Sequence, residues 1–269
     1  MPQLKEIGGK RIPFLRWSFW RMAFGAKHLV KHWQVGDGRE EALAQHVASS
    51  ATPGDLDAAI RAVDEFCYGQ SIMMNVGDEK GEILDAAIRR VDPRRLLELG
   101  TYCGYSALRT VRAMPSEAHL YSIEFSPDNA EIARRILSHA GVEDRVTVLV
   151  GTLGDGGRTI SALESQHGFG AGSLDFVFVD HAKDAYLPDL ERIVERGWLR
   201  PGAVVVADNV KFPGVPGYRE HMREHEGREW RTIEHETHVE YQTMLKDLVL
   251  ESEYLAPGAV VARGRAAPG

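Results

Sequence analysis

The segment Arg95-Leu-Leu-Glu-Leu-Gly100-Thr-Tyr-Cys-Gly104-Tyr-Ser106 sets the architecture expected for this chain. It begins as a short apolar segment typical of a buried strand and breaks at a glycine-rich turn. Glycine has no Cβ, so the backbone can turn sharply there and approach a ligand closely. The spacing is G-x-x-x-G rather than G-x-G-x-x-G, and no Lys-Ser/Thr pair follows. Both features disfavour a dinucleotide or triphosphate site.

From residue 94 onward, short apolar segments alternate with amphipathic ones, which predicts strands alternating with helices. Residues 175–179 and 203–207 are apolar on both faces, as central parallel strands covered by helices require. The sequence therefore predicts an α/β fold with a doubly wound, mostly parallel seven-stranded sheet, helices on both faces and ligands at the strands' carboxyl ends. Predicted strands are residues 95–99, 119–124, 145–150, 174–180, 203–208, 230–234 and 239–250. Predicted helices are residues 40–48, 56–67 (N-capped by Asp55), 77–90, 105–113, 127–140, 157–165 and 184–196.

Two acidic residues point to a nucleoside ligand. Glu124 closes the second predicted strand about 25 residues after the turn, where a carboxylate can accept from both hydroxyls of a ribose. Glu98, next to the turn, could hold the cationic end of the ligand, directly or through water. The alternative is a structural turn followed by a solvated acid. Together with Gly100, these residues look like the S-adenosylmethionine-binding signature of class I methyltransferases.

A second cluster of polar residues follows two later strands. Asp180 ends one predicted strand, and Asp208 and Asn209 end the next. Hard oxygen ligands suit Mg²⁺ rather than zinc, and the lone neighbouring His181 does not make a nitrogen-rich zinc site. Lys183 lies three residues after Asp180, where an ammonium beside a cation can lose its proton and act as a base. The alternative interpretation is that these acids cap the following helices.

The assembled motifs resemble catechol O-methyltransferase. They are residues 73–78 (Met-Met-Asn-Val-Gly-Asp), 98–106, 179–184 (Val-Asp-His-Ala-Lys-Asp) and 207–210 (Ala-Asp-Asn-Val), in the order that the family has them. The resemblance covers roughly residues 37–250, including Pro213-Gly-Val-Pro216. Spacing alone leaves Glu240 undecided between a site residue and a surface acid.

The resemblance implies a role for each matching residue. Asp180, Asp208 and Asn209 would bind Mg²⁺, Lys183 would take the proton from a catechol hydroxyl, and Glu240 would hold the second hydroxyl. Residues that would line the S-adenosylmethionine site are Met74, Val76, Glu98, Gly100, Tyr102, Ser106, Glu124, Asp180 and His181.

Three departures bear on the acceptor. Mammalian members of the family carry tryptophan where this chain has Ala182 and Ile72, and a small polar residue where it has Leu153; Pro213 is retained. The resemblance therefore predicts a wider acceptor pocket with the donor and metal chemistry unchanged. An O-methyltransferase for bulkier, caffeoyl-CoA-like phenolic acceptors is one alternative function. A non-catalytic S-adenosylmethionine-binding protein is another, although retention of Lys183 and the metal ligands argues against it.

Charge divides the chain unevenly. Residues 1–33 contain seven Lys/Arg and one acid, so a chain of net charge −7 carries +6 there and −13 over the rest. The acidic remainder argues against nucleic-acid binding, which needs clustered Lys and Arg. Only two cysteines occur, so a disulfide framework is excluded and a cytoplasmic setting is expected.

Three regions are expected: a basic, aromatic N-terminal extension (residues 1–36), a catalytic domain (residues 37–255) and a flexible tail (residues 256–269). Trp and Phe alternate with Lys and Arg in residues 1–33. One interpretation is an interfacial helix on anionic lipid. The other is a segment packed on its own domain or on a second subunit in an oligomer. Both stay open.

Overall fold

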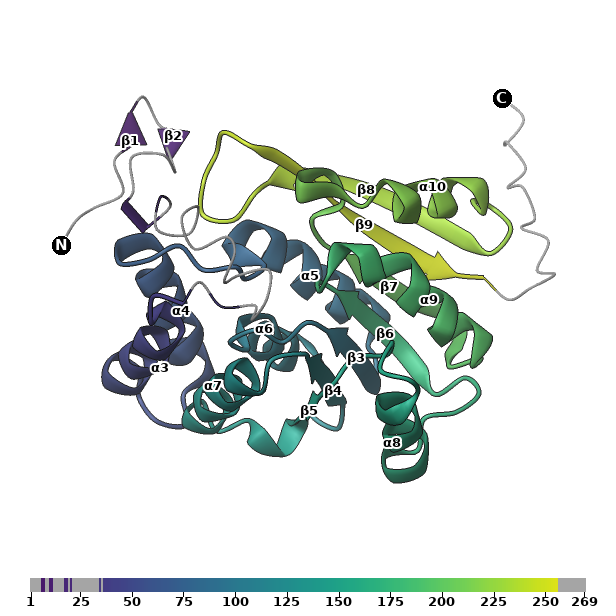
Figure 1. The fold of residues 1–269 in the computed structure, drawn as a ribbon, viewed down its shortest axis with the longest axis horizontal. Helices are drawn as coiled ribbons and strands as arrows, with labels where there is room; N and C mark the ends of the chain where they lie inside the picture. Colours follow the sequence, from purple (N-terminus) through teal and green to yellow (C-terminus); the bar gives the residue numbers. More distant parts are fainter. Residues whose placement is uncertain are drawn as a thin grey trace, which may run out of the picture.

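The computed structural model describes residues 36–255, together with residues 6–7, 10–11, 17–18, 20 and 34. Its main element is a seven-stranded sheet with the order β5-β4-β3-β6-β7-β9-β8 (Figure 1). The strands are β3 (Arg95–Leu99), β4 (His119–Glu124), β5 (Val146–Val150), β6 (Leu174–Val179), β7 (Leu199–Ala207), β8 (Trp230–His238) and β9 (Lys246–Tyr254). A separate two-stranded sheet pairs β1 (Glu6–Ile7) with β2 (Lys10–Arg11).

Strands β5, β4, β3, β6 and β7 run parallel, and β9 is antiparallel to both of its neighbours. The chain order reverses between β3 and β6, because β4 lies on one side of β3 and β6 on the other. Ligands in open α/β sheets bind at such a switch point, outside the carboxyl ends of the strands. The fold class predicted from the sequence is therefore confirmed.

Helices cover both faces of the sheet (Figure 1). Leu96 packs with the cluster that contains α3 to α7, whereas its neighbour Leu97 packs with the cluster that contains α8 to α10. Alternate residues of a strand point to opposite faces, so each strand contributes to both cores. The helices are α3 (Arg39–Ser50), α4 (Leu56–Gly69), α5 (Gly77–Val91), α6 (Tyr105–Ala113), α7 (Pro127–His139), α8 (Arg158–His167), α9 (Tyr186–Glu195) and α10 (Pro216–Glu224).

Helix starts follow local side-chain chemistry. The Asp55 carboxylate accepts from the Ala58 amide at 2.8 Å, as predicted, and satisfies one of the free N–H groups of α4. Ser126 caps α7 in the same way, with Pro127 in the first helical turn, where its missing N–H costs nothing.

Two predicted elements are corrected. The last strand was expected at residues 239–250, but β9 begins only at Lys246. The preceding residues form a turn in which Tyr241 has a left-handed backbone (φ 54°) and the Gln242 side chain bonds the Val239 and Leu245 carbonyls. The helix expected from residue 184 begins at Tyr186, after the 3₁₀ turn η3 (Lys183–Ala185). Helix α10 was not predicted.

The predictions for residues 1–33 and 256–269 fall almost wholly outside the described residues, so the N-terminal extension and the tail stay predictions. Within the part of the chain that the structure describes, no helix combines the length and the apolar character needed to cross a membrane.

Candidate active site

A cavity of about 1030 Å³ lies at the carboxyl ends of β3, β4, β6 and β7. Most of the site residues predicted from the sequence line it, although they come from distant parts of the chain. These residues are Met74, Val76, Gly100, Tyr102, Ser106, Glu124, Asp180, His181, Lys183, Asn209 and Glu240. The two exceptions, Glu98 and Asp208, are fully buried behind the wall.

Gly100 is required for a reason that the sequence did not show. Its φ is +101°, and a Cβ there would lie 2.2 Å from the Asp180 carbonyl oxygen. The neighbour that excludes a side chain is thus the end of β6 rather than a ligand alone. This close approach joins the two strand ends, so the glycine-rich turn and the first predicted metal ligand lie side by side.

Glu124 ties the glycine-rich turn to the end of β4. One carboxylate oxygen accepts from the Tyr102 amide at 2.7 Å, and the other accepts from the Ser126 amide at 2.8 Å. Burial raises the pKa of Glu124, and these amides oppose the shift. A carboxylate has about four acceptor positions, so Glu124 can still accept from a ligand's hydroxyls. The predicted ribose contact fits this geometry.

Glu98 has no exposed surface. Burial raises its pKa to about 7, against hydrogen bonds from Ser106 and Ser122 that favour the ionised form. Its Oε1 atom is buried without a hydrogen-bond partner among the described residues. An unpaired carboxylate oxygen next to the turn is a suitable acceptor for the ammonium group of an amino-acid ligand.

His181 is held in place by its neighbours. Its Nε2 lies 2.9 Å from Asp189 Oδ2, and its ring stacks on Tyr186 at 5.1 Å between centroids. The Nδ1 atom is buried and has no partner in the described structure. His181 also lines the cavity, so Nδ1 is available to a polar ligand atom.

Lys183 lies between two predicted metal ligands. Its Nζ donates to Asp180 Oδ1 at 3.0 Å and to Asn209 Oδ1 at 3.1 Å. A third bond, to Tyr186 Oη at 2.6 Å, fixes the ammonium, and Tyr186 in turn donates to the Asp208 carbonyl at 3.1 Å. The side-chain oxygen of Asn209, Oδ1, points toward Lys183 because the Nδ2 atom of the same amide donates to Glu240 and Asp247, at 3.1 and 3.0 Å.

Asp208 completes a set of oxygens that fits a divalent cation. Its Oδ1 atom lies 2.8 Å from Lys80 Nζ and accepts from the Asn209 amide at 2.6 Å. The Oδ2 atom is buried and has no partner within the described residues. Burial raises the pKa of Asp208, and the Lys80 ammonium opposes the shift. An orphaned carboxylate oxygen beside a carboxylate and an amide oxygen is the donor set that Mg²⁺ prefers.

This set contains two carboxylates and one amide. No group of three His, Cys, Asp or Glu side chains that could hold a metal ion occurs among the described residues. The fit to Mg²⁺ therefore depends on Asn209 as the third protein ligand, with the remaining positions left to water or substrate, as is usual for this ion.

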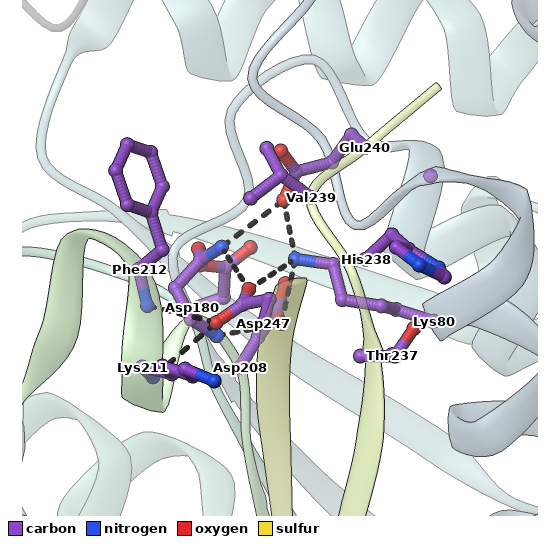
Figure 2. Close-up of polar contacts among 12 residues, drawn as sticks. Lys80, Asp180, Asp208, Lys211, Phe212, Thr237, His238, Val239, Glu240 and Asp247 are labelled. Carbon is purple, nitrogen blue, oxygen red and sulfur yellow. Dashed lines mark hydrogen bonds and ion pairs between the residues drawn. The ribbon is translucent and has the colours of Figure 1, made fainter. Parts of the chain in front are cut away.

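Sequence reasoning missed Lys80 and Asp247. Figure 2 shows the Lys80 ammonium among the carboxylates of Asp208, Glu240 and Asp247. Asp247 also accepts from the backbone amides of Lys211 and Phe212, at 3.2 and 2.9 Å. For Lys80 a signal existed, because it lies four residues before Leu84 and eight before Ile88, on the apolar stripe of α5.

The residues that depart from the family pattern also face the cavity. Ile72, Leu153 and Ala182 line it, and so does the retained Pro213. The turn between β8 and β9 brings Glu240 to the same wall, where its Oε1 atom contacts Lys80 and Asn209.

Comparison with known proteins gives consistent matches. The O-methyltransferase family model matches residues 52–245, which include the glycine-rich turn, both acidic strand ends and Glu240. A probable O-methyltransferase of Mycobacterium tuberculosis is 58% identical over 234 residues, or 87% of this chain and 100% of that protein. Catechol O-methyltransferase B of Danio rerio is 42% identical over 217 residues, or 81% of this chain and 79% of that protein. The O-methyltransferase TomG from Streptomyces achromogenes, solved in complex with SAM, matches with a TM-score of 0.57 at 28% identity, over 74% of this chain and 89% of that chain.

Proposed function

The chain belongs to the O-methyltransferase family, and from this premise we propose that it transfers a methyl group from S-adenosylmethionine to one hydroxyl of a catechol-type diol in the presence of Mg²⁺. The observation that carries the proposal is the position of Lys183 Nζ, within 3.0 Å of Asp180 and 3.1 Å of Asn209, in the same cavity as the glycine-rich turn. The proposed base, the proposed metal ligands and the proposed donor site would thus face one cavity.

The donor would bind over the glycine-rich turn. Glu98 would accept from its ammonium group through Oε1, and Glu124 from its ribose hydroxyls. Met74, Val76, Tyr102, Ser106 and His181 would line the same site. The fold supports this assignment, since ligands of doubly wound sheets lie at the strands' carboxyl ends.

Asp180, Asp208 and Asn209 would hold the metal ion. When bound, Mg²⁺ would supply a field that favours the ionised form of a coordinated hydroxyl. Glu240 would accept from the second hydroxyl of the diol and so orient the first toward the donor. Orientation of this kind contributes a large share of the rate, up to about 7–11 kcal/mol in well-aligned cases.

The transfer step needs no covalent enzyme intermediate. Lys183, whose ammonium must first give up a proton to solvent, takes the hydroxyl proton at Nζ. The freed oxygen lone pair forms a bond to the methyl carbon while the bond from that carbon to sulfur breaks, and its electron pair stays on sulfur. The products are the methyl ether and S-adenosylhomocysteine.

Methyl transfer from labelled S-adenosylmethionine to 3,4-dihydroxybenzoate and to caffeate, with Mg²⁺ or EDTA, tests the proposal. We expect metal-dependent monomethylation that is lost in Lys183→Ala and in Asp180→Ala. Donor binding without transfer to any diol would refute it and favour a non-catalytic binding protein.

A second candidate acceptor class is supported by the cavity wall. Ala182, Ile72 and Leu153 line the cavity, and its volume of about 1030 Å³ lies at the upper end of the range for a single small ligand. A bulkier phenolic ester, such as a caffeoyl-CoA-like acceptor, would share the donor and metal. Comparing the catalytic efficiency for caffeate and its coenzyme A ester separates the two classes. The cytoplasmic setting, expected from the sparse cysteines, stays a prediction.

A further inference from the structure

Lys80 is a buried cation on the acceptor side. The residue is 2% exposed, and its Nζ contacts the carboxylates of Asp208 at 2.8 Å, Asp247 at 3.2 Å and Glu240. The ammonium enters from the first turn of α5, whereas the three acids come from the ends of β7 and β9 and the turn before β9 (Figure 2). An ammonium has three donors, and here each one has a carboxylate partner.

Lys80 is surrounded by acids. Its ammonium contacts three carboxylates, those of Asp208, Glu240 and Asp247, and so neutralises part of the acidic cluster. The other cluster ammonium, Lys183, contacts Asp180 on the opposite side of Asn209.

The contacts divide the acids into two groups. Asp208 offers Oδ1 to Lys80 and keeps Oδ2 unpaired in the described structure, so it can serve a metal ion with the free oxygen. Glu240 and Asp247 instead direct oxygens to Lys80 and to Asn209 Nδ2. Of the four carboxylates, Asp180 contacts Lys183 and Asp208 keeps one oxygen unpaired in the described structure, whereas Glu240 and Asp247 both contact Lys80 and the Asn209 amide nitrogen.

We propose that Lys80 is a positioning residue that keeps Glu240 out of the metal's coordination shell and thereby reserves it for the acceptor's second hydroxyl. This inference rests on the proposed function. Lys80 thus acts as a built-in monovalent cation beside the divalent one. It limits the protein ligands of the metal to Asp180, Asp208 and Asn209.

Removing the Lys80 ammonium should change the affinity for a divalent cation and the affinity for the diol in opposite directions. In Lys80→Met the acidic cluster gains one unit of net negative charge, so a divalent cation binds more tightly. Glu240 loses its partner and turns toward that cation, so it no longer meets the acceptor. We expect Mn²⁺ to bind about tenfold or more tightly, given the strength of charge interactions over a few ångströms in a protein. We expect the diol to bind at least tenfold more weakly.

The experiment compares the parent protein with Lys80→Met, Lys80→Arg and Lys211→Met by calorimetric titration. Mn²⁺ affinity is measured without acceptor, and 3,4-dihydroxybenzoate affinity with Mn²⁺ and S-adenosylhomocysteine present. Lys80→Arg retains the charge and should keep both affinities near those of the parent. Lys211→Met removes an exposed charge near the same strand end and should leave both unchanged. A loss of both affinities in Lys80→Met, or no change in either, would overturn the inference.

Two controls keep the result decisive. If Lys80→Met does not fold, the double variant Lys80→Met, Asp247→Asn removes one charge of each sign and leaves the net charge of the cluster unchanged. It should still bind the diol more weakly, because Glu240 has lost its partner, and any gain in Mn²⁺ affinity then comes from Glu240 alone. If the parent binds neither Mn²⁺ nor a diol, the proposed function is wrong and the inference falls with it. If the parent binds both and the variants show no divergence, only the role of Lys80 is wrong.

Discussion

The proposed donor side and the proposed acceptor side of the cavity are built on opposite principles. The donor side uses two carboxylates, Glu98 and Glu124, whose partners are hydroxyl and amide groups within residues 98–129. The acceptor side uses four carboxylates and two ammoniums from four separate segments, and Lys80 bonds Asp247 across 167 residues of sequence. The two donor-side carboxylates are therefore fixed by uncharged groups close in sequence, whereas the acceptor side depends on a balance of buried charges from distant segments.

The largest expected effect is the loss of the base. Lys183→Met should lower kcat by about 10²–10⁴-fold, the usual contribution of general base catalysis, while the donor dissociation constant is unchanged. Stopped methyl-transfer assays and donor titration measure the two quantities, with Lys211→Met as the control lysine. If Lys183→Met retained the turnover of the parent, Lys183 would not be the base of the acceptor side.

The free energy of unfolding should depend more on the buried charges of the acceptor side than on exposed ion pairs. Asp247 accepts from Lys80, Asn209 and two backbone amides, so Asp247→Asn should lower the free energy of unfolding by about 3 kcal/mol, as expected when a buried ion pair loses one partner. Glu253→Gln on the same strand breaks a partly exposed pair with Arg231 and should cost less than about 1 kcal/mol. Urea unfolding of both variants gives the comparison, and equal losses would contradict it.

Donor affinity should depend on pH through Glu98. Burial raises its pKa from 4.5 to about 7, so below pH 7 the folded protein binds a proton there that the unfolded chain does not. Without donor, this group makes the fold more stable as the pH falls from 7 toward 4.5. The ionised form holds the donor's ammonium, so donor affinity should instead fall, by up to about tenfold per pH unit below 7.

Titration calorimetry with S-adenosylhomocysteine between pH 5.5 and 8 follows this change, because the product retains the donor's amino-acid group. Glu98→Gln should bind more weakly at pH 8 and lose the pH dependence. The exposed Glu117→Gln should behave as the parent. A pH profile unchanged by Glu98→Gln would remove Glu98 from the donor site.

The smallest effect is expected at the cavity wall. Ala182→Trp narrows the cavity on the acceptor side, so it should reduce the catalytic efficiency for a bulky phenolic ester by about tenfold, the scale of a steric change in an apolar pocket. Efficiency for a simple catechol should change little, which makes the two substrates mutual controls. An equal loss for both would mean that Ala182 contributes to the donor site instead.

This contrast also explains what the sequence could predict. Strands β3 and β4 begin and end where the apolar pattern places them, and Asp180, Asp208 and Asn209 could be located because carboxyl ends of parallel strands share one edge. Lys80 was missed because a lysine in an amphipathic helix is normally solvated, although its place on the apolar stripe of α5 signalled burial. Asp247 carried no such signal, since its partners lie on α5 and at the end of β7 and are adjacent only after the antiparallel strand has paired.

The insertion of β9 between β7 and β8 has a consequence for biosynthesis. Chains emerge from the ribosome N-terminus first, and their domains fold as the required segments become available. Every donor-side residue from Met74 to His181 is made before the last strand, but Glu240 and Asp247 arrive near the end, and β9 must then pair on both sides. A chain released before Val239 would leave the edge of β7 open to pairing with another copy. The pairing of β9 thus makes the proposed acceptor side form later in synthesis than the proposed donor side.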